Sequence, residues 1–456
     1  MSTAISTPTS SRFTARQRLI LLVLLGAGFM LSVDFSILNV ALPEVGAGVG
    51  LTATGLPWIV SAYALPAAGF TLLFGRVADL FGRRKVFLAG MSLLVAASIL
   101  GGAAVTPEVL LTARVLQGFA TAMTIPAALS LLTTTFPEGA LRERVLGLNG
   151  ALLSGGFTVG ALVGGTLVGL LGWRAAFFVN VPVALAILVA TPLLLEESGV
   201  AERMKLDVAG AVTVSGGLLA TIYSVIEHSL PMAVVGVVLL AAFWIVETRA
   251  ASPLAPPRIL ARPNVKWGNY GGLVTLAAES GIIFMTTLYL QKVLELSPLI
   301  TGLVFGVPGL TAVAAGPIAG RLVGRFGSRR VLAVALFVQG LATVPLALLG
   351  ADRAALPILL GALFVGFFGH VTAIVAYTVT GTTGLQDHEQ GLATGLTSMT
   401  QQVAVTIGVP ILSSIAATQH GELTGIHLGT TVGAVTILVS AAIVWFRLRS
   451  APSPTE

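Results

Sequence analysis

The chain has 456 residues, of which 55% are hydrophobic and 10% charged, with a mean hydropathy of +0.95. A soluble globular domain carries roughly a quarter of charged residues, so this composition excludes that class and indicates a polytopic α-helical membrane protein. The net charge of +6 is typical of basic residues retained in cytoplasmic loops, and it does not indicate nucleic-acid binding. The chain has no cysteine, which excludes disulfides and cysteine metal ligands, and we predict no metal site.

Fourteen apolar segments follow a Ser/Thr-rich tail at residues 1–17, which we expect to be disordered. Each segment is close to the roughly 20 residues that cross a bilayer as a helix. The short segment 231–248 is also compatible with a re-entrant or interfacial helix. The predicted spans are 19–41, 55–74, 86–105, 109–131, 146–170, 175–195, 207–227, 231–248, 268–290, 299–319, 331–350, 355–379, 394–417 and 426–446.

Basic residues are distributed unequally between the two sets of loops. Of the 25 Lys and Arg residues, Arg114 lies inside a predicted span. Three lie in one set of loops, and the other 21 lie in the opposite loops and the tails. Such an excess marks the cytoplasmic side. Because an even number of spans returns the chain to its starting side, we predict a multi-pass protein of the cell membrane with both termini in the cytoplasm.

The most basic loop of the chain, residues 75–86, has a second copy. Gly75 and Gly320 begin the two copies 245 residues apart, and the same spacing separates Asp34 from Glu279. Two six-span units therefore share one plan, an arrangement found in many transporters. We divide the chain into a tail (1–17), an N-terminal six-helix bundle (18–198), two inserted spans (199–250), a C-terminal six-helix bundle (251–449) and a second cytoplasmic tail (450–456).

The basic loop carries a recognisable motif with the pattern G-x-x-x-D-x-x-G-R-[RK]-[RK]. Through it the chain resembles the major facilitator superfamily and, within it, the fourteen-span drug:proton antiporter group. The resemblance implies the major facilitator fold and a loop that latches the cytoplasmic side. The alternative is a loop that only sets the orientation of the chain in the membrane, although this role requires no acidic residue at Asp79. In the second copy Gly324 replaces this acid. The predicted gate residues are Gly75, Asp79, Gly82, Arg83, Arg84 and Lys85.

Three charged residues lie inside predicted spans and at least five residues from either end of the span. Residues 32–43 read S-V-D-F-S-I-L-N-V-A-L-P, similar to the L-D-x-T-I-V-N-V-A-L-P of that group, and contain Asp34. Arg114 belongs to an R-x-x-Q-G element that the resemblance associates with proton transfer. A buried guanidinium cannot lose its charge and needs an anionic partner, for which Asp34 is the candidate. We predict that Asp34, Arg114 and Glu279 couple transport to protons; a structural ion pair is the alternative.

Residues 156–165 read G-F-T-V-G-A-L-V-G-G, which resembles the antiporter pattern G-x-x-x-G-P-x-x-G-G with alanine in place of the proline. Small residues at a spacing of four allow two helices to pack closely. We therefore assign Gly156, Gly160, Gly164 and Gly165 to helix packing. The next motif, residues 173–182, resembles the W-R-x-x-F-x-x-N-x-P of the same group and supports the family assignment without indicating a mechanism.

Polar residues inside the spans indicate a midplane cavity between the two halves. Thr275 lies four residues before Glu279 and on roughly the same helix face. A single membrane histidine is often structural, so His370 and the adjacent glutamines of span thirteen are weaker candidates. The predicted substrate-cavity residues are Asp34, Gln117, Thr275, Glu279, His370, Gln401 and Gln402.

The chain contains no Walker-type G-x-x-x-x-G-K-[ST] motif, and isolated buried carboxylates suit a proton relay better than bond hydrolysis. We therefore predict a monomeric, non-enzymatic exporter of lipophilic, drug-like and in part cationic compounds. We expect it to be driven by the proton gradient, to need no cofactor, and to have the lipid bilayer rather than nucleic acid as its environment. An exporter of an endogenous metabolite or lipid on the same fold, and a non-transporting membrane sensor, are the alternatives.

Overall fold

The computed structural model describes residues 13–52, 55–136, 140–197, 207–227, 229–250, 253, 257–383 and 387–449, and every regular element in these ranges is helical. The first half contains α1 (Ala15–Val49), α2 (Leu56–Phe81), α3 (Arg83–Gly102), α4 (Pro107–Thr135), α5 (Ala140–Leu171), α6 (Ala175–Phe178) and α7 (Asn180–Leu194). The inserted pair is α8 (Val208–Ile226) and α9 (Leu230–Arg249).

The second half begins with α10 (Pro257–Leu260) and α11 (Pro263–Leu288), which continues as a π-helical turn, η2 (Tyr289–Val293). It then contains α12 (Pro298–Phe326), α13 (Ser328–Thr343), α14 (Leu356–Thr382), α15 (Asp387–Ala416) and α16 (Glu422–Arg449). Two short 3₁₀ turns, η3 (Val344–Leu348) and η4 (Arg353–Ala355), join α13 to α14.

Local sequence explains where several helices begin and end. At the start of α1, Thr14 accepts from the Gln17 backbone N–H at 3.2 Å, and Thr14 N–H donates to the Gln17 side chain at 2.9 Å, which forms a capping box. At the α2–α3 turn Gly82 has φ +109°, and at the α12–α13 turn Gly327 has φ +81°. Only glycine adopts such a φ readily, and these two glycines are 245 residues apart, so the repeated turn is built the same way in both halves.

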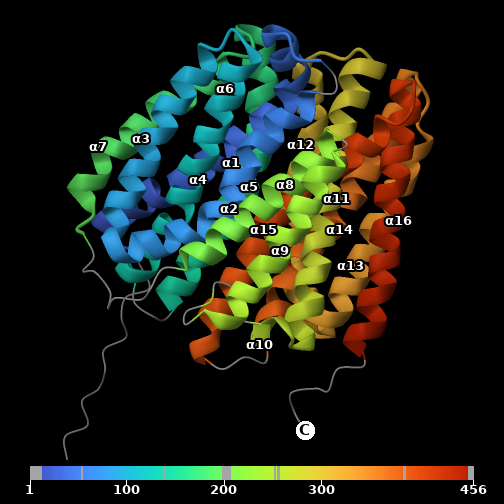
Figure 1. The fold of residues 1–456 in the computed structure, drawn as a ribbon. Coiled ribbons are helices and arrows are strands. Elements are labelled where there is room, and N and C mark those ends of the chain that lie inside the picture. The colour runs from blue at the N-terminus through green and yellow to red at the C-terminus, as the bar shows by residue number, and fades with distance from the viewer. Residues whose placement is uncertain are drawn as a thin grey trace, which may run out of the picture.

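The helices form two bundles that repeat each other. In the first half α1 packs on α4, α5 and α7, and α3 packs on α4 and α7; in the second half α11 packs on α14, α15 and α16, and α13 on α14 and α16. Figure 1 shows the first half (blue to green) beside the second (yellow to red). The predicted all-α membrane fold, with two six-helix bundles and an inserted pair, is confirmed.

Twelve helices in the described ranges are long and apolar enough to cross a membrane, including the short inserted helix α9. Helices α2 and α5 occupy the two remaining predicted segments. Large apolar side chains such as Leu193 (78% exposed) and Leu310 (73% exposed) lie on the outside of the bundles. A contiguous apolar surface of this kind requires lipid around it.

The two halves meet along two seams, α5 with α12 and α2 with α15. At the first seam a Cβ on Gly165 would lie 2.6 Å from the carbonyl oxygen of Pro298 and 3.0 Å from the Cα of Gly302, so the backbones touch. At the second, Thr406 donates to the carbonyl of Ala64 at 3.0 Å. Glycine permits the first contact because it has no side chain to separate the helices.

The inserted helix α8 lies against the second seam and contacts both halves. Ser215 donates to the carbonyl of Gly69 in α2 at 2.9 Å, and Ser414 in α15 donates to the carbonyl of Val225 at 2.9 Å. Figure 1 shows α8 and α9 (light green) between the two bundles. The insertion therefore covers the seam.

We name the two ends of the molecule by the residues they hold. The basic end contains the α2–α3 turn at Arg84 and the start of α1, because both contact the end of α7. The far end contains the end of α1 and the segment between α5 and α6, which meet where Trp173 packs on Gly48.

Candidate functional site

Asp34 of α1 and Arg114 of α4 meet inside the first bundle. Arg114 Nη1 lies 3.5 Å from Asp34 Oδ2, and the two side chains are 1% and 0% exposed. The predicted contact between these residues is therefore present. Gln117, one turn further along α4, donates from Nε2 to Asp34 Oδ1 at 3.3 Å. The opposite charges of Asp34 and Arg114 neutralise each other inside the bundle. Either charge buried without the other would destabilise the fold.

The guanidinium of Arg114 is held on every side. Its Nε donates to the carbonyl of Ile59 at 3.0 Å, and its Nη1 donates to Gln117 Oε1 at 2.7 Å. The guanidinium carbon lies 4.4 Å from the centre of the Tyr63 ring, and Tyr63 OH is 2.9 Å from Thr121 Oγ1. The planar fork of arginine satisfies these contacts together, which a lysine ammonium cannot do.

Two further side chains complete this cluster, and sequence reasoning assigned neither of them to it. Asn180, the first residue of α7, donates from Nδ2 to Asp34 Oδ1 and to Ser98 Oγ, the latter at 3.4 Å. Gln117 Nε2 also donates to Ser98 Oγ, at 3.2 Å. Asn180 belongs to the motif at residues 173–182, so the sequence offered a reason to consider it. Ser98 belongs to no motif, and nothing in the sequence pointed to it. We call Asp34, Ser98, Arg114, Gln117 and Asn180 the first-half cluster.

Glu279 of α11 lies in a second buried cluster, at the position equivalent to Asp34. Gln339 of α13 donates from Nε2 to Glu279 Oε2 at 2.9 Å, and Thr275 donates to Gln339 Oε1 at 2.6 Å. A hydroxyl has one proton, so in the 3.0 Å contact between Thr275 Oγ1 and His370 Nδ1 the imidazole N–H donates. His370 Nδ1 is also 4.0 Å from Glu279 Oε2. Sequence reasoning missed Gln339. These four residues form the second-half cluster.

The two clusters differ in how well they are sealed. Asp34 and Arg114 have side chains at most 1% exposed, whereas those of Glu279 and His370 are each 8% exposed. No arginine of the described residues forms an ion pair with Glu279, whose hydrogen-bond donor is the neutral Gln339. The second-half cluster is therefore slightly less completely buried than the first-half cluster.

The remaining predicted cavity residues, Gln401 and Gln402, lie on α15. Gln401 of α15 is exposed and Gln402 is half-buried. Neither side chain has a hydrogen bond to a cluster member among the contacts of the described residues. Their assignment to a substrate cavity stays a prediction.

The α2–α3 turn is held by a carboxylate that the sequence did not indicate. Glu197, just beyond α7, accepts from the backbone N–H groups of Arg84 at 3.0 Å and of Lys85 at 3.2 Å. Arg84 Nη1 donates to the carbonyl of Leu195 at 2.9 Å. Free N–H groups at a helix N-terminus attract an anion, so Glu197 caps α3. The turn at Gly82 thus joins the end of α7.

The other predicted gate residues are placed as follows. Gly75 lies within α2, where a Cβ would be 3.5 Å from Pro126 of α4, an ordinary contact distance. Arg83 is half-buried and Lys85 is exposed. The side chain of Asp79 lies outside the described residues, so its predicted latch contact stays a prediction.

The glycines of α5 pack against two different helices. Gly156, Gly160 and Gly164 face α1, where a Cβ on Gly164 would lie 2.8 Å from the Cα of Ile37. Gly165 faces α12 in the other half. All four glycines lie where a Cβ would come within 3 Å of a neighbouring helix, and three of them face the helix that carries the buried acid.

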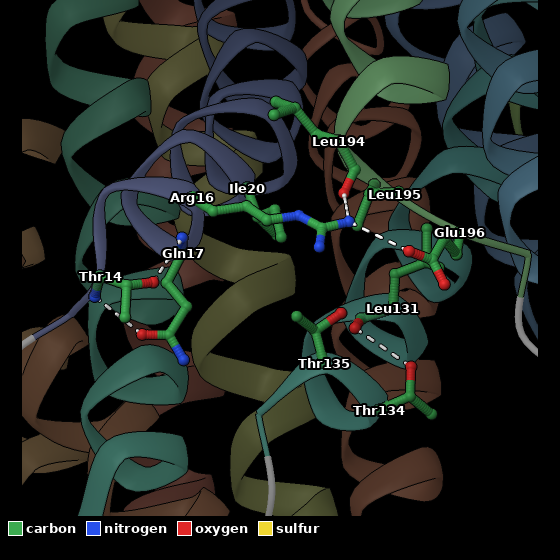
Figure 2. A pocket seen from close by; sticks show the side chains of 10 residues that line it. All are labelled: Thr14, Arg16, Gln17, Ile20, Leu131, Thr134, Thr135, Leu194, Leu195 and Glu196. Atoms are coloured by element: carbon green, nitrogen blue, oxygen red, sulfur yellow. Dashed lines mark hydrogen bonds and ion pairs between the residues drawn. The ribbon is translucent and has the colours of Figure 1, made fainter.

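A cavity of about 360 Å³ lies at the basic end, between α1, α4 and the end of α7. Figure 2 shows Arg16 crossing it to reach Glu196 Oε1 at 3.2 Å and the carbonyl of Leu194 at 3.3 Å. Neither buried acid lines this cavity. Its lining residues are Thr14, Arg16, Gln17, Ile20, Leu131, Thr134, Thr135, Leu194, Leu195 and Glu196.

Known proteins with similar sequences are resistance and export proteins. The chain is 34% identical to a puromycin resistance protein of Streptomyces alboniger, over 94% of this chain and 91% of the relative. It is 33% identical to a cephamycin export protein of Amycolatopsis lactamdurans, over 96% and 93%. A lincomycin resistance protein of Streptomyces lincolnensis is 30% identical over 89% and 86%.

Solved structures agree on the fold. A POT family transporter in complex with 5-aminolevulinic acid superposes with a TM-score of 0.72 at 13% identity, over 96% of each chain. The human organic anion transporter MFSD10 gives a TM-score of 0.65 at 17% identity. Residues 24–409 match the family model of the Major Facilitator Superfamily. This match covers most of the chain and agrees with the two repeated helix bundles, so the chain belongs to the Major Facilitator Superfamily of transporters.

Proposed function

We propose that this protein exports antibiotic-like, lipophilic small molecules from the cell in exchange for protons. The observation that carries the substrate class is the similarity to relatives named for puromycin resistance and cephamycin export along nearly their whole length. These names describe different antibiotics, so they support a class of compound rather than one substrate.

The topology that fits this role has fourteen crossings of the cell membrane, counting α2 and α5 with the twelve spans described above. The excess of basic residues in one set of loops supports a cytoplasmic position for the basic end and for both termini. The far end, where Trp173 and Gly48 meet, is then external.

Alternating access between the two halves is supported by a difference between the two ends of the α5–α12 seam. On α12, Gly320 and Gly324 lie eighteen residues, or five turns, after Gly302 and Gly306, and so on the same face. A Cβ on Gly306 would lie 3.0 Å from Leu162 of α5, whereas no atom of the described residues lies within 4 Å of a Cβ on Gly320 or Gly324. The contacts of the described residues across this seam therefore lie in its external part.

Proton coupling is supported by the first-half cluster. A carboxylate in the membrane interior is costly unless it is paired, and Asp34 has one charged partner, Arg114, 3.5 Å away. Protonation of Asp34 removes that pairing, because arginine keeps its charge. A proton can therefore favour one arrangement of α1 and α4 over another, which is the differential interaction that a coupled conformational change requires.

Substrate contact is supported by the second-half cluster. Glu279 and His370 are slightly less buried than Asp34 and Arg114, and no arginine of the described residues forms an ion pair with Glu279. A carboxyl of this kind can accept a cationic group of a substrate without first breaking an ion pair. We assign to this cluster the recognition of cationic substrates.

Transport into inverted membrane vesicles tests the proposal. An imposed pH gradient, acidic inside, should drive uptake of puromycin by vesicles that contain the protein, and collapse of the gradient with a protonophore should abolish it. Vesicles with Asp34→Asn serve as the matched control and should take up no more than empty vesicles. Gradient-independent puromycin uptake would contradict proton exchange. The absence of uptake across a panel of antibiotics, with protein correctly inserted, would favour a metabolite exporter instead.

A further inference from the structure

The segment that connects α5 to α7 is anchored on both neighbouring helices at the external end. Trp173 packs on Gly48 of α1, where a Cβ would lie 2.8 Å from the indole Cε2. Arg174 donates from Nη2 to the carbonyl of Ala104 at 3.0 Å, just beyond the end of α3. The short helix α6 then leads directly to α7. This segment is therefore in contact with both α1 and the end of α3.

The first residue after this segment reaches the buried acid. Asn180 is 1% exposed, and both protons of its Nδ2 are used, one toward Asp34 Oδ1 and one toward Ser98 Oγ. Gln117 Nε2 aims at the same two oxygens from the other side. Four amide N–H donors thus converge on Asp34 Oδ1 and Ser98 Oγ, which is the whole donor capacity of two side-chain amides.

The two oxygens of Asp34 are consequently different. Oδ1 accepts from Asn180 and Gln117, whereas Oδ2 is buried and has no hydrogen bond, only the charge of Arg114 Nη1 at 3.5 Å. A proton on Oδ1 would have to displace an N–H donor. A proton on Oδ2 displaces no amide N–H donor, and it faces the Arg114 guanidinium, which can only donate hydrogen bonds.

We propose that Asn180 is the positioning residue of the proton site: it keeps Oδ1 of Asp34 as a fixed acceptor and leaves Oδ2 as the oxygen that gains and loses the proton. This inference rests on the proposed role of Asp34 in proton exchange. In the step itself an O–H bond forms at Oδ2, a hydronium ion becomes water, and the Asp34–Arg114 pair passes from zero net charge to one positive charge. Two donors then face each other, so the pair separates.

The position of Asn180 also connects the external end to the proton site. Its backbone begins α7 directly after the segment that Trp173 and Arg174 anchor on α1 and α3. Displacement of that segment moves the amide relative to Asp34, and removal of the amide frees Oδ1. The W-R-x-x-F-x-x-N-x-P motif thereby acquires a mechanical role, which is to hold the amide on the acid while the external end is closed.

The test compares two transport modes in proteoliposomes with the full chain and puromycin as the substrate. Uphill uptake driven by a pH gradient requires proton exchange, whereas exchange of labelled for unlabelled puromycin moves no net proton. We expect Asn180→Ala to reduce uphill uptake about tenfold or more, the scale of a lost hydrogen bond to a charged group, and to retain puromycin exchange. Asn269→Ala is the matched control, because Asn269 is a buried amide that donates to the carbonyl of Val265 in its own helix and accepts from Thr400 of α15 at 2.9 Å, and these hydrogen bonds involve no member of either cluster.

A double-mutant cycle separates positioning from packing. Because Asp34→Asn is expected to abolish uphill uptake by itself, the cycle is measured in puromycin exchange. If Asn180 acts through Asp34, Asn180→Ala added to Asp34→Asn should cause no further loss of exchange, whereas a packing role would add its own loss. Asn180→Leu, which fills the volume, replaces Asn180→Ala if the smaller variant does not accumulate. Uphill uptake at the wild-type rate in both variants, equal loss of the two modes, or additive losses would overturn the inference. Wild-type uphill uptake by Asp34→Asn would instead overturn the proposed function.

Discussion

Glu279 occupies in α11 the position that Asp34 occupies in α1, and the two carboxyl groups have different partners. Asp34 faces the guanidinium of Arg114 at 3.5 Å, whereas Glu279 accepts from the neutral amide of Gln339 at 2.9 Å. The repeat thus conserves the position of an acid within the chain while changing the charge around it. This difference motivates a division of labour between proton exchange in the first half and substrate contact in the second.

Replacement of each acid by its amide should separate these roles. Glu279→Gln preserves shape and removes the charge, so we expect it to abolish export of a cationic substrate and to spare a neutral one. Asp34→Asn should abolish proton-driven export of both, because the ion pair with Arg114 is lost in every state. The separation of these roles is measured by efflux of one cationic and one neutral compound by each of the two variants under the same pH gradient. Equal loss of both compounds in Glu279→Gln would make Glu279 a second proton site.

Arg114→Lys should not restore the activity that Arg114→Ala loses. Lysine cannot contact Asp34, Gln117 and the carbonyl of Ile59 together while stacking on a ring, as the guanidinium does. We expect both variants to lose about tenfold or more of gradient-driven uptake, consistent with breaking a buried charge pair. Uptake by vesicles containing equal amounts of each variant is the measurement, and full activity of Arg114→Lys would reduce the residue to a positive charge.

The cap on α3 predicts a contrast between two adjacent glutamates. Glu197→Ala removes the acceptor for two backbone N–H groups at the α2–α3 turn, a loss of about 0.5–2 kcal/mol for a helix cap. Glu196→Ala removes only an exposed pair with Arg16 (side chains 89% and 62% exposed), which contributes little. We expect a lower Tm and slower export for Glu197→Ala, and neither for Glu196→Ala. The same Tm for both variants would show that the cap does not hold the turn.

Two glycines of α5 that are five residues apart should differ in their tolerance of alanine. A Cβ on Gly160 would lie 2.7 Å from the carbonyl oxygen of Val33 in α1, whereas no described atom lies within 4 Å of a Cβ on Gly155. Overpacking costs about 1–3 kcal/mol, while alanine in an open helical position stabilises by about 0.5–1 kcal/mol. Gly160→Ala should lower the Tm and the export rate, and Gly155→Ala should lower neither. Thermal unfolding in detergent is sufficient to compare them.

The orientation can be tested with single cysteines, since the native chain has none. Lys85 is exposed at the basic end, and Val105, between α3 and α4, is 71% exposed at the far end. An impermeant thiol reagent applied to intact cells should label Val105→Cys, and it should label Lys85→Cys only after the membrane is broken. Labelling of Lys85→Cys in intact cells would reverse the assigned topology.

The sequence by itself determined the features that depend on local pattern. Apolar runs of about 20 residues identified the helices, and the spacing of 245 residues identified the repeat. In this repeat the structure has positive-φ turns at Gly82 and Gly327. The glycines of α5 predicted close packing because their spacing is local to one helix. The pairing of Asp34 with Arg114 followed from charge alone, since a buried guanidinium requires an anion and the first half offers few.

Only the tertiary structure decided which neutral groups complete each site. Ser98, Asn180 and Gln339 lie on helices far along the chain from the acids that they contact, and a single polar residue in an apolar span has no periodicity to reveal its partner. Glu197 is a further case, because any carboxylate near the α2–α3 turn could have capped α3. The packing of whole helices selects such partners, and the side chains that end up facing each other make the hydrogen bonds that burial demands.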